Sequence, residues 1–319
     1  MNHIQVVGGA GFIGSRLCKL LHKDNLSFSI LDLKESSLFP ELSKKADVRS
    51  VNQLANEVES SSCIINLAAE HRDDVTPLSL YDEVNVNGAE NICKIAEQKG
   101  INKIVFTSSV AVYGFAPPDT DESGDIAPFN DYGRTKYEAE KIFISWQRKD
   151  PHQRMLSIIR PTVVFGEGNR GNVYNLLRQI SSGRFIMIGS GNNKKSMAYV
   201  DNVAQFIKHS LNFAPGVHIY NYVDKPDLTM NKLVSFINSV VKGNHTVGFR
   251  LPYFVGLIAG SVFDLLAKLT GRKLPISTIR VKKFCATTQF SSKAKQSGFK
   301  PLVDLSEGLK RTIESEFLD

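Results

Sequence analysis

A short apolar stretch followed by a glycine-rich turn, close to the start of the chain, limits the possible folds more than any other feature. Ile4–Val7 is apolar, and Gly8-Gly9-Ala10-Gly11-Phe12-Ile13-Gly14 follows it. An amphipathic pattern then continues to about His22, so the sequence predicts a strand, a tight turn and a helix. Gly8 permits the turn, Gly11 lets the backbone approach a pyrophosphate, and Gly14 lets the helix pack closely on the sheet. The N–H groups at the start of the helix then face the anion.

An acidic residue at the end of the second predicted strand indicates which dinucleotide binds. Asp32 lies 21 residues after Gly11. A carboxylate there hydrogen-bonds a ribose 2′-hydroxyl and repels a 2′-phosphate, which favours NAD over NADP. The positive charge of Lys34 nearby weakens this preference for NAD over NADP. The alternative interpretation is a glycine turn that binds no ligand.

Apolar stretches alternate with helical patterns through the first half of the chain. Residues 27–31, 63–67 and Lys103–Thr107 are predicted strands, and residues 81–98 have helical spacing. This alternation predicts an α/β fold: a Rossmann-type doubly wound parallel sheet with helices on both faces. We expect an NAD-binding domain at residues 1–165, to which the chain returns at about 195–225. A smaller C-terminal α/β lobe at residues 166–319 would mainly bind the substrate.

Hydroxyl and ammonium groups follow this pattern at positions suited to acid–base chemistry. Ser108 and Ser109 come directly after a predicted strand, and ligands bind at the carboxyl ends of such strands. Tyr132 and Lys136 share one face if they lie on a helix. A neighbouring ammonium and a positively charged nicotinamide both lower the pKa of a phenol, so Tyr132 is a candidate base. A Tyr-x-x-x-Lys pair on the surface is the alternative.

The cysteines and the first residues of the chain predict the compartment in which the protein resides. The four cysteines Cys18, Cys63, Cys93 and Cys285 are scattered, which predicts free thiols, a reducing compartment and no zinc site. The first residues enter a strand without a basic or apolar leader, so no signal peptide and a cytoplasmic protein are expected.

Positive charge is concentrated near the C-terminus. Residues 268–311 hold eleven Lys or Arg and two acids, a net +9, whereas the whole chain is +7. Such asymmetry predicts an anionic partner: a phosphorylated substrate or an anionic membrane surface. No nucleic-acid recognition motif is present, so nucleic acid is not expected as a partner. A solvated basic face is the alternative.

Together these motifs resemble the extended short-chain dehydrogenase/reductases, and in particular the NAD-dependent sugar epimerases and dehydratases. The resemblance covers about residues 3 to 310. It rests on residues 8–14, Asp32, Leu67-Ala68-Ala69, Val84-Asn85-Val86-Asn87-Gly88, Ser108-Ser109, Val112-Tyr113-Gly114 and Tyr132-Gly133-Arg134-Thr135-Lys136.

The resemblance implies a role for each matching residue. Ser109 would hydrogen-bond the substrate hydroxyl, Tyr132 would be the acid/base, and Lys136 would hold the ribose and tune Tyr132. Asp47 and Val48 would flank the adenine, and Pro161 would lie near the carboxamide. The expected NAD contacts are Gly8, Gly11, Phe12, Ile13, Gly14, Asp32, Asp47, Val48, Leu67, Ala68, Ala69, His71, Tyr132, Lys136 and Pro161.

The same resemblance separates two reactions. The 4,6-dehydratases carry Asp-Glu after the catalytic hydroxyl residue, but this chain has Val110-Ala111, so dehydration is rejected. Epimerisation needs only the Ser109, Tyr132 and Lys136 set and tightly held NAD. The sugar is oxidised at C4 to a 4-keto form, turns over in the site, and is reduced on its other face.

The residues after the catalytic motif leave several substrates open. Many members that act on nucleotide sugars have Arg-Tyr-Phe-Asn where this chain has Arg160-Pro161-Thr162-Val163. The Arg-Pro form also resembles hydroxysteroid dehydrogenases, whose substrates are apolar. A soluble UDP-N-acetylglucosamine (or UDP-glucose) 4-epimerase, an NAD-dependent dehydrogenase of an apolar alcohol and a non-catalytic NAD-sensing protein remain alternatives.

An apolar face in residues 251–269 points to a membrane surface. Asp264 and Lys268 argue against a span, but an amphipathic helix followed by Arg272 and Lys273 suits a membrane interface. Burial in the small lobe or at a homodimer interface is the alternative. The apolar positions with helical spacing are Phe254, Leu257, Ile258, Val262, Leu265, Leu266 and Leu269, with Ser261 among them.

Four longer segments narrow the resemblance to bacterial 4-epimerases that act on N-acetylglucosamine linked through diphosphate to undecaprenol. They are residues 69–75, 165–175, 220–228 and 280–290. This resemblance implies a lipid-linked substrate used for O-antigen or related glycans, at the cytoplasmic face of the inner membrane. It gives Arg280, Lys195 and Arg170 as diphosphate candidates, Asn172 as a further substrate contact, and Thr287 as a small residue that leaves room for an N-acetyl group.

Overall fold

A seven-stranded parallel sheet forms the centre of the larger part of the computed structural model, which describes residues 3–60, 62–72, 75–271 and 277–318. The strand order is β10-β6-β5-β4-β1-β2-β3. This confirms the expected Rossmann-type α/β fold. The strands are β1 (Ile4–Val7), β2 (Phe28–Asp32), β3 (Ser43–Lys45), β4 (Cys63–Asn66), β5 (Lys103–Thr107), β6 (Met155–Pro161) and β10 (Gly216–Tyr222).

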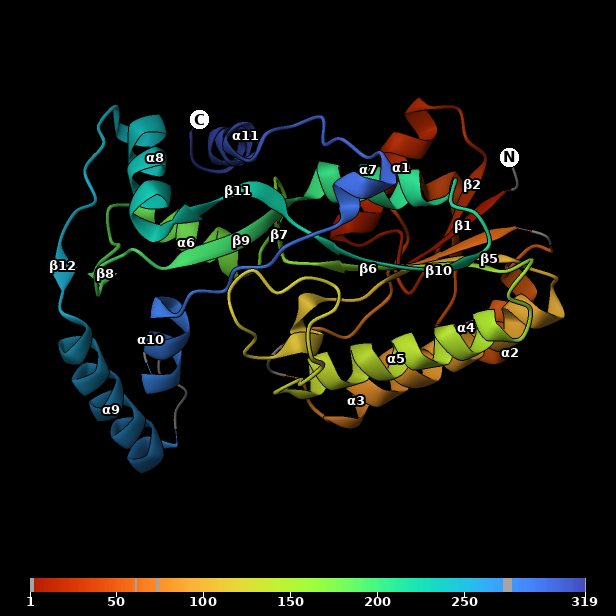
Figure 1. Ribbon diagram of the computed structural model, residues 1–319, viewed down its shortest axis with the longest axis horizontal. Helices are drawn as coiled ribbons and strands as arrows, with labels where there is room; N and C mark the ends of the chain where they lie inside the picture. Colours follow the sequence, from red (N-terminus) through yellow and green to blue (C-terminus); the bar gives the residue numbers. More distant parts are fainter. Residues whose placement is uncertain (1–2, 61, 73–74, 272–276, 319) are drawn as a thin grey trace.

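Helices cover both faces of this sheet, as Figure 1 shows. One face packs on α1 (Phe12–Lys23) and α7 (Val200–Ser210), and the other on α2 (Val51–Glu57), α4 (Gly88–Gln98) and α5 (Asp131–Arg148). Because both faces are covered, the central strands are continuous apolar runs: all four residues of β1 and of β4 are buried. Short helical turns η1 (Pro40–Leu42) and η4 (Ala294–Ser297) and the helix α3 (Ser79–Tyr81) complete the edges.

A smaller lobe is built on a second sheet. Strand order β11-β9-β7 joins β11 (Asp224–Thr229), β9 (Lys194–Tyr199) and β7 (Val163–Phe165). Its core packs α6 (Asn172–Ser181), α8 (Met230–Lys242) and α11 (Leu305–Phe317) around Tyr199 and Leu309. At its far end β8 (Met187–Ile188) pairs with β12 (Arg250–Leu251), and α9 (Tyr253–Thr270) and α10 (Thr278–Cys285) extend from there (Figure 1).

The strand order reverses at β1: β2 and β3 are added on one side of it and β4, β5 and β6 on the other, and this switch point positions the site. β1 pairs with β2 on one side and β4 on the other. In open α/β sheets the crevice at such a switch point binds the ligand. The loops that follow β1 and β4 meet there: a Cβ added to Gly8 would lie 2.6 Å from the Ala68 nitrogen.

Candidate active site

The glycine turn has the geometry that a pyrophosphate requires. Gly8 has φ +80°, a conformation that side chains rarely adopt. A Cβ on Gly14 would lie 2.5 Å from the Gly8 carbonyl oxygen, so the start of α1 packs directly on the turn. Gly11 caps α1 without a side-chain hydrogen bond, which leaves the first N–H groups of α1, those of Phe12 and Ile13, directed at a ligand. These features fit NAD.

The Asp32 carboxylate faces the glycine turn across the crevice. It accepts hydrogen bonds from the backbone nitrogens of Ala10 at 3.1 Å and Lys34 at 3.2 Å. The carboxylate is therefore fixed where a ribose hydroxyl would be recognised. Further along this edge, the Arg49 guanidinium hydrogen-bonds the Asp47 carboxylate and lowers its pKa. Val48 is buried and would lie 3.1 Å from a Cβ added to Gly88, next to the predicted adenine position.

A buried asparagine holds the loop after β4 against the catalytic helix. Asn85 belongs to η2 (Asp82–Asn87), a π-helical turn of the kind that occurs at functional sites. Its side chain pairs with both backbone groups of Glu70, at 2.9 and 3.0 Å, and donates to the Thr135 hydroxyl at 2.9 Å. This fixes the half-buried Leu67, Ala68 and Ala69 beside the glycine turn. His71 is exposed at the end of the loop.

The predicted catalytic hydroxyls come together at the start of α5. Ser109 follows β5 and begins η3 (Val110–Tyr113), where its Oγ accepts from the Ala111 nitrogen at 3.1 Å. A Cβ on Gly133 would lie 2.5 Å from the Ala111 carbonyl oxygen, so the first turn of α5 packs on η3. This close contact brings Tyr132 beside Ser109, whose side chain hydrogen-bonds the phenol.

Burial and hydrogen bonding act on the pKa of Tyr132 in opposite directions. Burial is the largest influence and raises this pKa, whereas the hydrogen bond from Ser109 lowers it. The Lys136 ammonium, expected to lower it, lies instead over the Phe106 ring at 4.4 Å from its centre. Burial also lowers the pKa of Lys136, to about 7. In the protein without NAD, burial therefore has the largest effect on the pKa of both Tyr132 and Lys136.

A buried polar network lies beneath the candidate catalytic residues, and sequence patterns alone do not indicate it. Glu140, fully buried one helical turn after Lys136, accepts two hydrogen bonds from Arg160, at 2.9 and 2.5 Å. It also accepts from the Ser108 hydroxyl at 2.5 Å. Arg160 donates to the Tyr113 oxygen at 2.6 Å, and Tyr113 donates to the Asn221 side chain at 2.8 Å. The network thus joins α5, the residue after β5, η3, β6 and β10 at the site.

The predicted diphosphate residues fall into two groups. Lys195 donates to the carbonyl oxygens of Lys283 at 2.9 Å and Ala286 at 2.6 Å, and burial lowers its pKa to about 8. The Thr287 hydroxyl accepts from the Lys194 nitrogen at 3.3 Å. Arg280 is exposed on α10. The structure therefore associates Lys195, Arg280 and Thr287 with α10 and the residues just after it.

Arg170 and Asn172 form the second group, next to α11. Arg170 pairs with the Glu316 carboxylate at 2.8 Å and lies over the Tyr174 ring. Asn172 is exposed at the first position of α6. A charged partner already neutralises Arg170, so a diphosphate would have to compete with Glu316.

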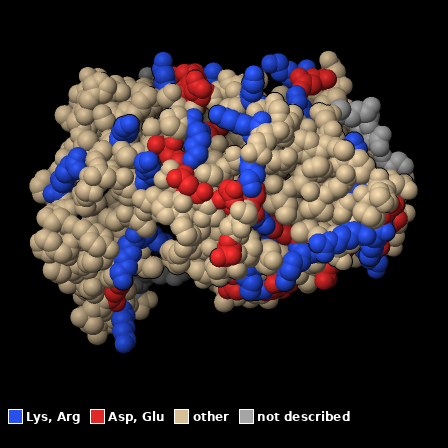
Figure 2. Space-filling model, in the orientation of Figure 1, with Lys and Arg blue, Asp and Glu red and all other residues tan. Residues whose placement is uncertain are grey.

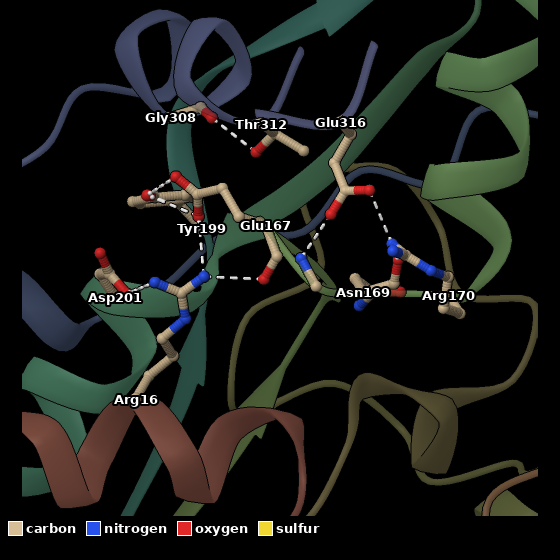
Figure 3. A network of polar contacts seen from close by, with 10 residues as sticks. Arg16, Glu167, Asn169, Arg170, Tyr199, Asp201, Gly308, Thr312 and Glu316 are labelled. Carbon is tan, nitrogen blue, oxygen red and sulfur yellow. Dashed lines mark hydrogen bonds and ion pairs between the residues drawn. The ribbon is translucent and has the colours of Figure 1, made fainter. Parts of the chain in front are cut away.

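One acidic residue connects the dinucleotide helix to the smaller lobe. Figure 3 shows Arg16 of α1 reaching the carbonyl oxygen and carboxylate of Glu167, at 2.7 and 3.1 Å. The Tyr199 hydroxyl donates to the same carboxylate at 2.9 Å, and Asp201 lies 3.6 Å from the Arg16 guanidinium. The loop that leads to Arg170 is therefore fixed relative to the glycine turn.

The predicted helix at residues 251–269 forms, but it is not buried in the lobe. Only 11% of α9 is buried, and by length and composition it could cross a membrane. It touches the rest of the protein through Gly256 and Gly260, its two buried residues, and through Asp264, which accepts from the Thr278 nitrogen at 3.0 Å. Its exposed apolar side chains are Phe254, Ile258, Val262, Leu265, Leu266 and Leu269.

The remaining expectations concern metals, thiols and a few residues without a described position. Cys18, Cys63, Cys93 and Cys285 are free thiols, as expected. Within the described residues, no group of His, Cys, Asp or Glu side chains could hold a metal ion. Asp73, Asp74, Arg272 and Lys273 lie outside the described residues.

Comparisons with known proteins agree with this geometry. The chain is 47% identical over 319 residues to the N-acetyl-alpha-D-glucosaminyl-diphospho-ditrans,octacis-undecaprenol 4-epimerase of Escherichia coli O157:H7, covering 99% of this chain and 96% of that one. It is 27% identical to the UDP-glucose 4-epimerase of Vibrio cholerae, over 98% of this chain and 94% of that one. The fold matches the Thermus thermophilus UDP-glucose 4-epimerase solved with NAD, with TM-score 0.74, 19% identity and 98% of both chains covered.

A family model also matches the chain. Residues 4–222, which contain the glycine turn, Asp32, Ser109, Tyr132 and Lys136, fit the sequence model of one family throughout. The chain belongs to the NAD dependent epimerase/dehydratase family, and its cofactor is NAD.

Proposed function

We propose that this protein is an NAD-dependent 4-epimerase that interconverts N-acetylglucosamine and N-acetylgalactosamine on a diphospho-undecaprenol carrier, for O-antigen or related surface glycans. One observation carries the proposal: the 47% identity to a relative of that activity, which extends over nearly the whole of both chains. Residues 1–165 would form the NAD-binding domain and residues 166–319 mainly the substrate lobe.

The catalytic residues support an epimerisation in which no net oxidation occurs. NAD held by the glycine turn and Asp32 would supply the hydride acceptor and donor for C4 of the sugar, and its positive ring would favour the phenolate of Tyr132. Tyr132 accepts the proton of the 4-hydroxyl and later gives it back. Ser109 hydrogen-bonds the same oxygen, and Lys136 orients the ribose. The 4-keto sugar turns over between the two transfers, so the atoms of substrate and product are the same.

The exposed apolar face of α9 supports contact with the bilayer that holds such a substrate. Phe254 is 64% exposed, Ile258 61% and Leu269 74%. In Figure 2 the region of α9 and α10, at the lower left, is largely uncharged and crossed by a row of basic side chains. Apolar anchors beside Lys and Arg suit an anionic membrane interface. Because α9 is docked on α10, the protein would lie on the cytoplasmic face of the inner membrane rather than span it. In a homodimer, the exposed apolar face of α9 would form the interface between the two subunits.

The carrier is tested by assaying purified protein with two substrates, N-acetylglucosamine-diphospho-undecaprenol and UDP-N-acetylglucosamine. We expect efficient turnover of the lipid-linked sugar, no net change in NADH absorbance, and loss of activity in Tyr132→Phe. Efficient turnover of the UDP-sugar alone would replace the proposal with a nucleotide-sugar epimerase. Stoichiometric NADH formation would indicate a dehydrogenase, and activity unaffected by Tyr132→Phe a non-catalytic protein.

Membrane contact is tested by flotation with vesicles that contain anionic lipid. Ile258→Glu and Leu265→Glu should each reduce the bound fraction, because a charge on the apolar face opposes insertion. Leu302→Glu is the matched control, since Leu302 is also exposed, at 79%, but lies outside α9. Wild-type protein that stays unbound, or a control that is released equally, would contradict the interfacial role of α9.

A further inference from the structure

A pocket of about 350 Å³ lies at the base of α9. It is lined by β8 and the turn after it, the first residue of α9, and the last turn of α10. Figure 1 shows β8, α9 and α10 at the same end of the molecule. Its volume is at the lower end of the range for small-molecule sites. The lining residues are Ile188, Gly189, Ser190, Asn193, Tyr253, Lys282, Cys285 and Ala286.

Contacts between three elements fix the walls of this pocket. The Cys285 thiol donates to the Ile188 carbonyl at 3.3 Å, and Asn193 donates to the Phe284 carbonyl at 2.8 Å. A Cβ on Gly256 would lie 2.6 Å from the Ile188 side chain, so only glycine lets α9 approach this closely. The pocket is therefore a built feature of the lobe.

Basic and apolar groups both border the pocket. Lys282 of α10 lines it, and Lys195 lies close by, because it donates to the carbonyl oxygen of the lining residue Ala286 at 2.6 Å. Tyr253 also lines the pocket, is 42% exposed and begins the apolar face of α9. The pocket thus adjoins both basic groups that suit a diphosphate and an apolar surface that suits a bilayer.

We propose that this pocket binds the isoprene units next to the diphosphate of a polyprenyl-linked substrate and directs the rest of the chain along α9. The inference rests on the proposed function and adds a lipid subsite to it. The volume holds only a short part of the polyprenyl chain, and the remainder lies on the apolar face and in the bilayer.

Cys285 provides a reporter that needs no mutation. It is the half-buried cysteine of the chain and lines the pocket, whereas Cys18, Cys63 and Cys93 are all buried. The rate of Cys285 alkylation by N-ethylmaleimide is measured on the full-length, NAD-loaded protein with farnesyl diphosphate, inorganic diphosphate or UDP. Farnesyl diphosphate at ten times its dissociation constant should slow alkylation about tenfold by mass action. Inorganic diphosphate and UDP should leave the rate unchanged.

Two results would overturn the proposal: equally fast alkylation with and without farnesyl diphosphate, or protection by UDP. A variant gives an independent measurement. Tyr253→Glu should raise KM for the lipid-linked sugar at least about tenfold, equivalent to about 1.4 kcal/mol, with kcat retained. Leu302→Glu is the control for an added surface charge. An unchanged KM in Tyr253→Glu would also count against the subsite.

These outcomes separate the subsite from the proposed function. If the protein turns over the lipid-linked sugar while Cys285 stays unprotected, the subsite is wrong and the epimerase activity stands. If the protein turns over only the UDP-sugar, the proposed function itself fails.

Discussion

Glu140→Gln tests how the buried network supports catalysis. Glu140 is fully buried, and one turn of α5 separates it from Lys136. Its carboxylate raises the pKa of Lys136, while the larger effect of burial lowers that pKa to about 7. Glutamine keeps the size and much of the hydrogen bonding but removes the negative charge. The ammonium form of Lys136 should therefore become less stable.

Two magnitudes follow from the structure. Removing one partner of a buried ion pair costs about 3–5 kcal/mol of unfolding free energy, and hydrogen bonds from Ser108 and Arg160 to glutamine place the expected loss at the lower end. The second effect is on protonation. A fall of one unit in the pKa of Lys136, about 1.4 kcal/mol, would reduce the ammonium fraction at pH 7 from about one half to about one tenth.

The assay is kcat of the NAD-loaded protein from about pH 6 to about pH 9. Turnover that needs the ammonium is lost as pH rises through the pKa of Lys136, so this alkaline limb should move to lower pH in the variant. Simple destabilisation would lower kcat without moving the limb. Glu138→Gln is the matched control, since Glu138 is partly exposed on the same helix and pairs with Lys141. A folded Glu140→Gln protein with the wild-type profile would refute the reasoning.

Three further predictions concern other parts of the molecule. Tyr132→Phe should lower kcat by at least about 100-fold and retain NAD, measured by turnover and cofactor content; a smaller loss would contradict its role as acid/base. Gly14→Ala should purify with less NAD, because the new Cβ would lie 2.5 Å from the Gly8 carbonyl oxygen; full occupancy would show that the turn adjusts. Burial raises the pKa of Asp224 to about 6, so the folded protein binds this proton more tightly than the unfolded chain. That contribution to stability is present at low pH and is lost as pH rises through about 6. In urea unfolding, the free energy of unfolding of wild type relative to that of Asp224→Asn should therefore increase from pH 7 to pH 5.

Local patterns were sufficient to predict the dinucleotide half of the site. The order of apolar strand, glycine turn and helix determines where Gly8, Gly14 and Asp32 lie, because parallel strands bring their carboxyl ends to one edge. Ser109 and Tyr132 were predictable for the same reason: each begins the element that follows a strand or loop at this edge.

Long-range pairing was beyond a single sequence. In the sequence, Glu140 is one of several polar residues of α5. Nothing in its spacing indicates that it pairs with Arg160 of β6 in the core. The effect of burial on the pKa of Tyr132 was also beyond a single sequence, because burial depends on the packing of distant elements. The apolar pattern of α9 predicted a helix, but whether its face is covered by the lobe depends on Gly256 and Gly260, which dock only one side.

The Glu167 carboxylate accepts hydrogen bonds from Arg16 of α1 and from Tyr199 of β9. Moving α1 relative to the smaller lobe would therefore break one of these contacts. Arg16 lies about one turn beyond the N–H groups that would meet a pyrophosphate. A displacement of α1 would therefore disturb the loop that leads to Arg170, because Glu167 in that loop holds Arg16.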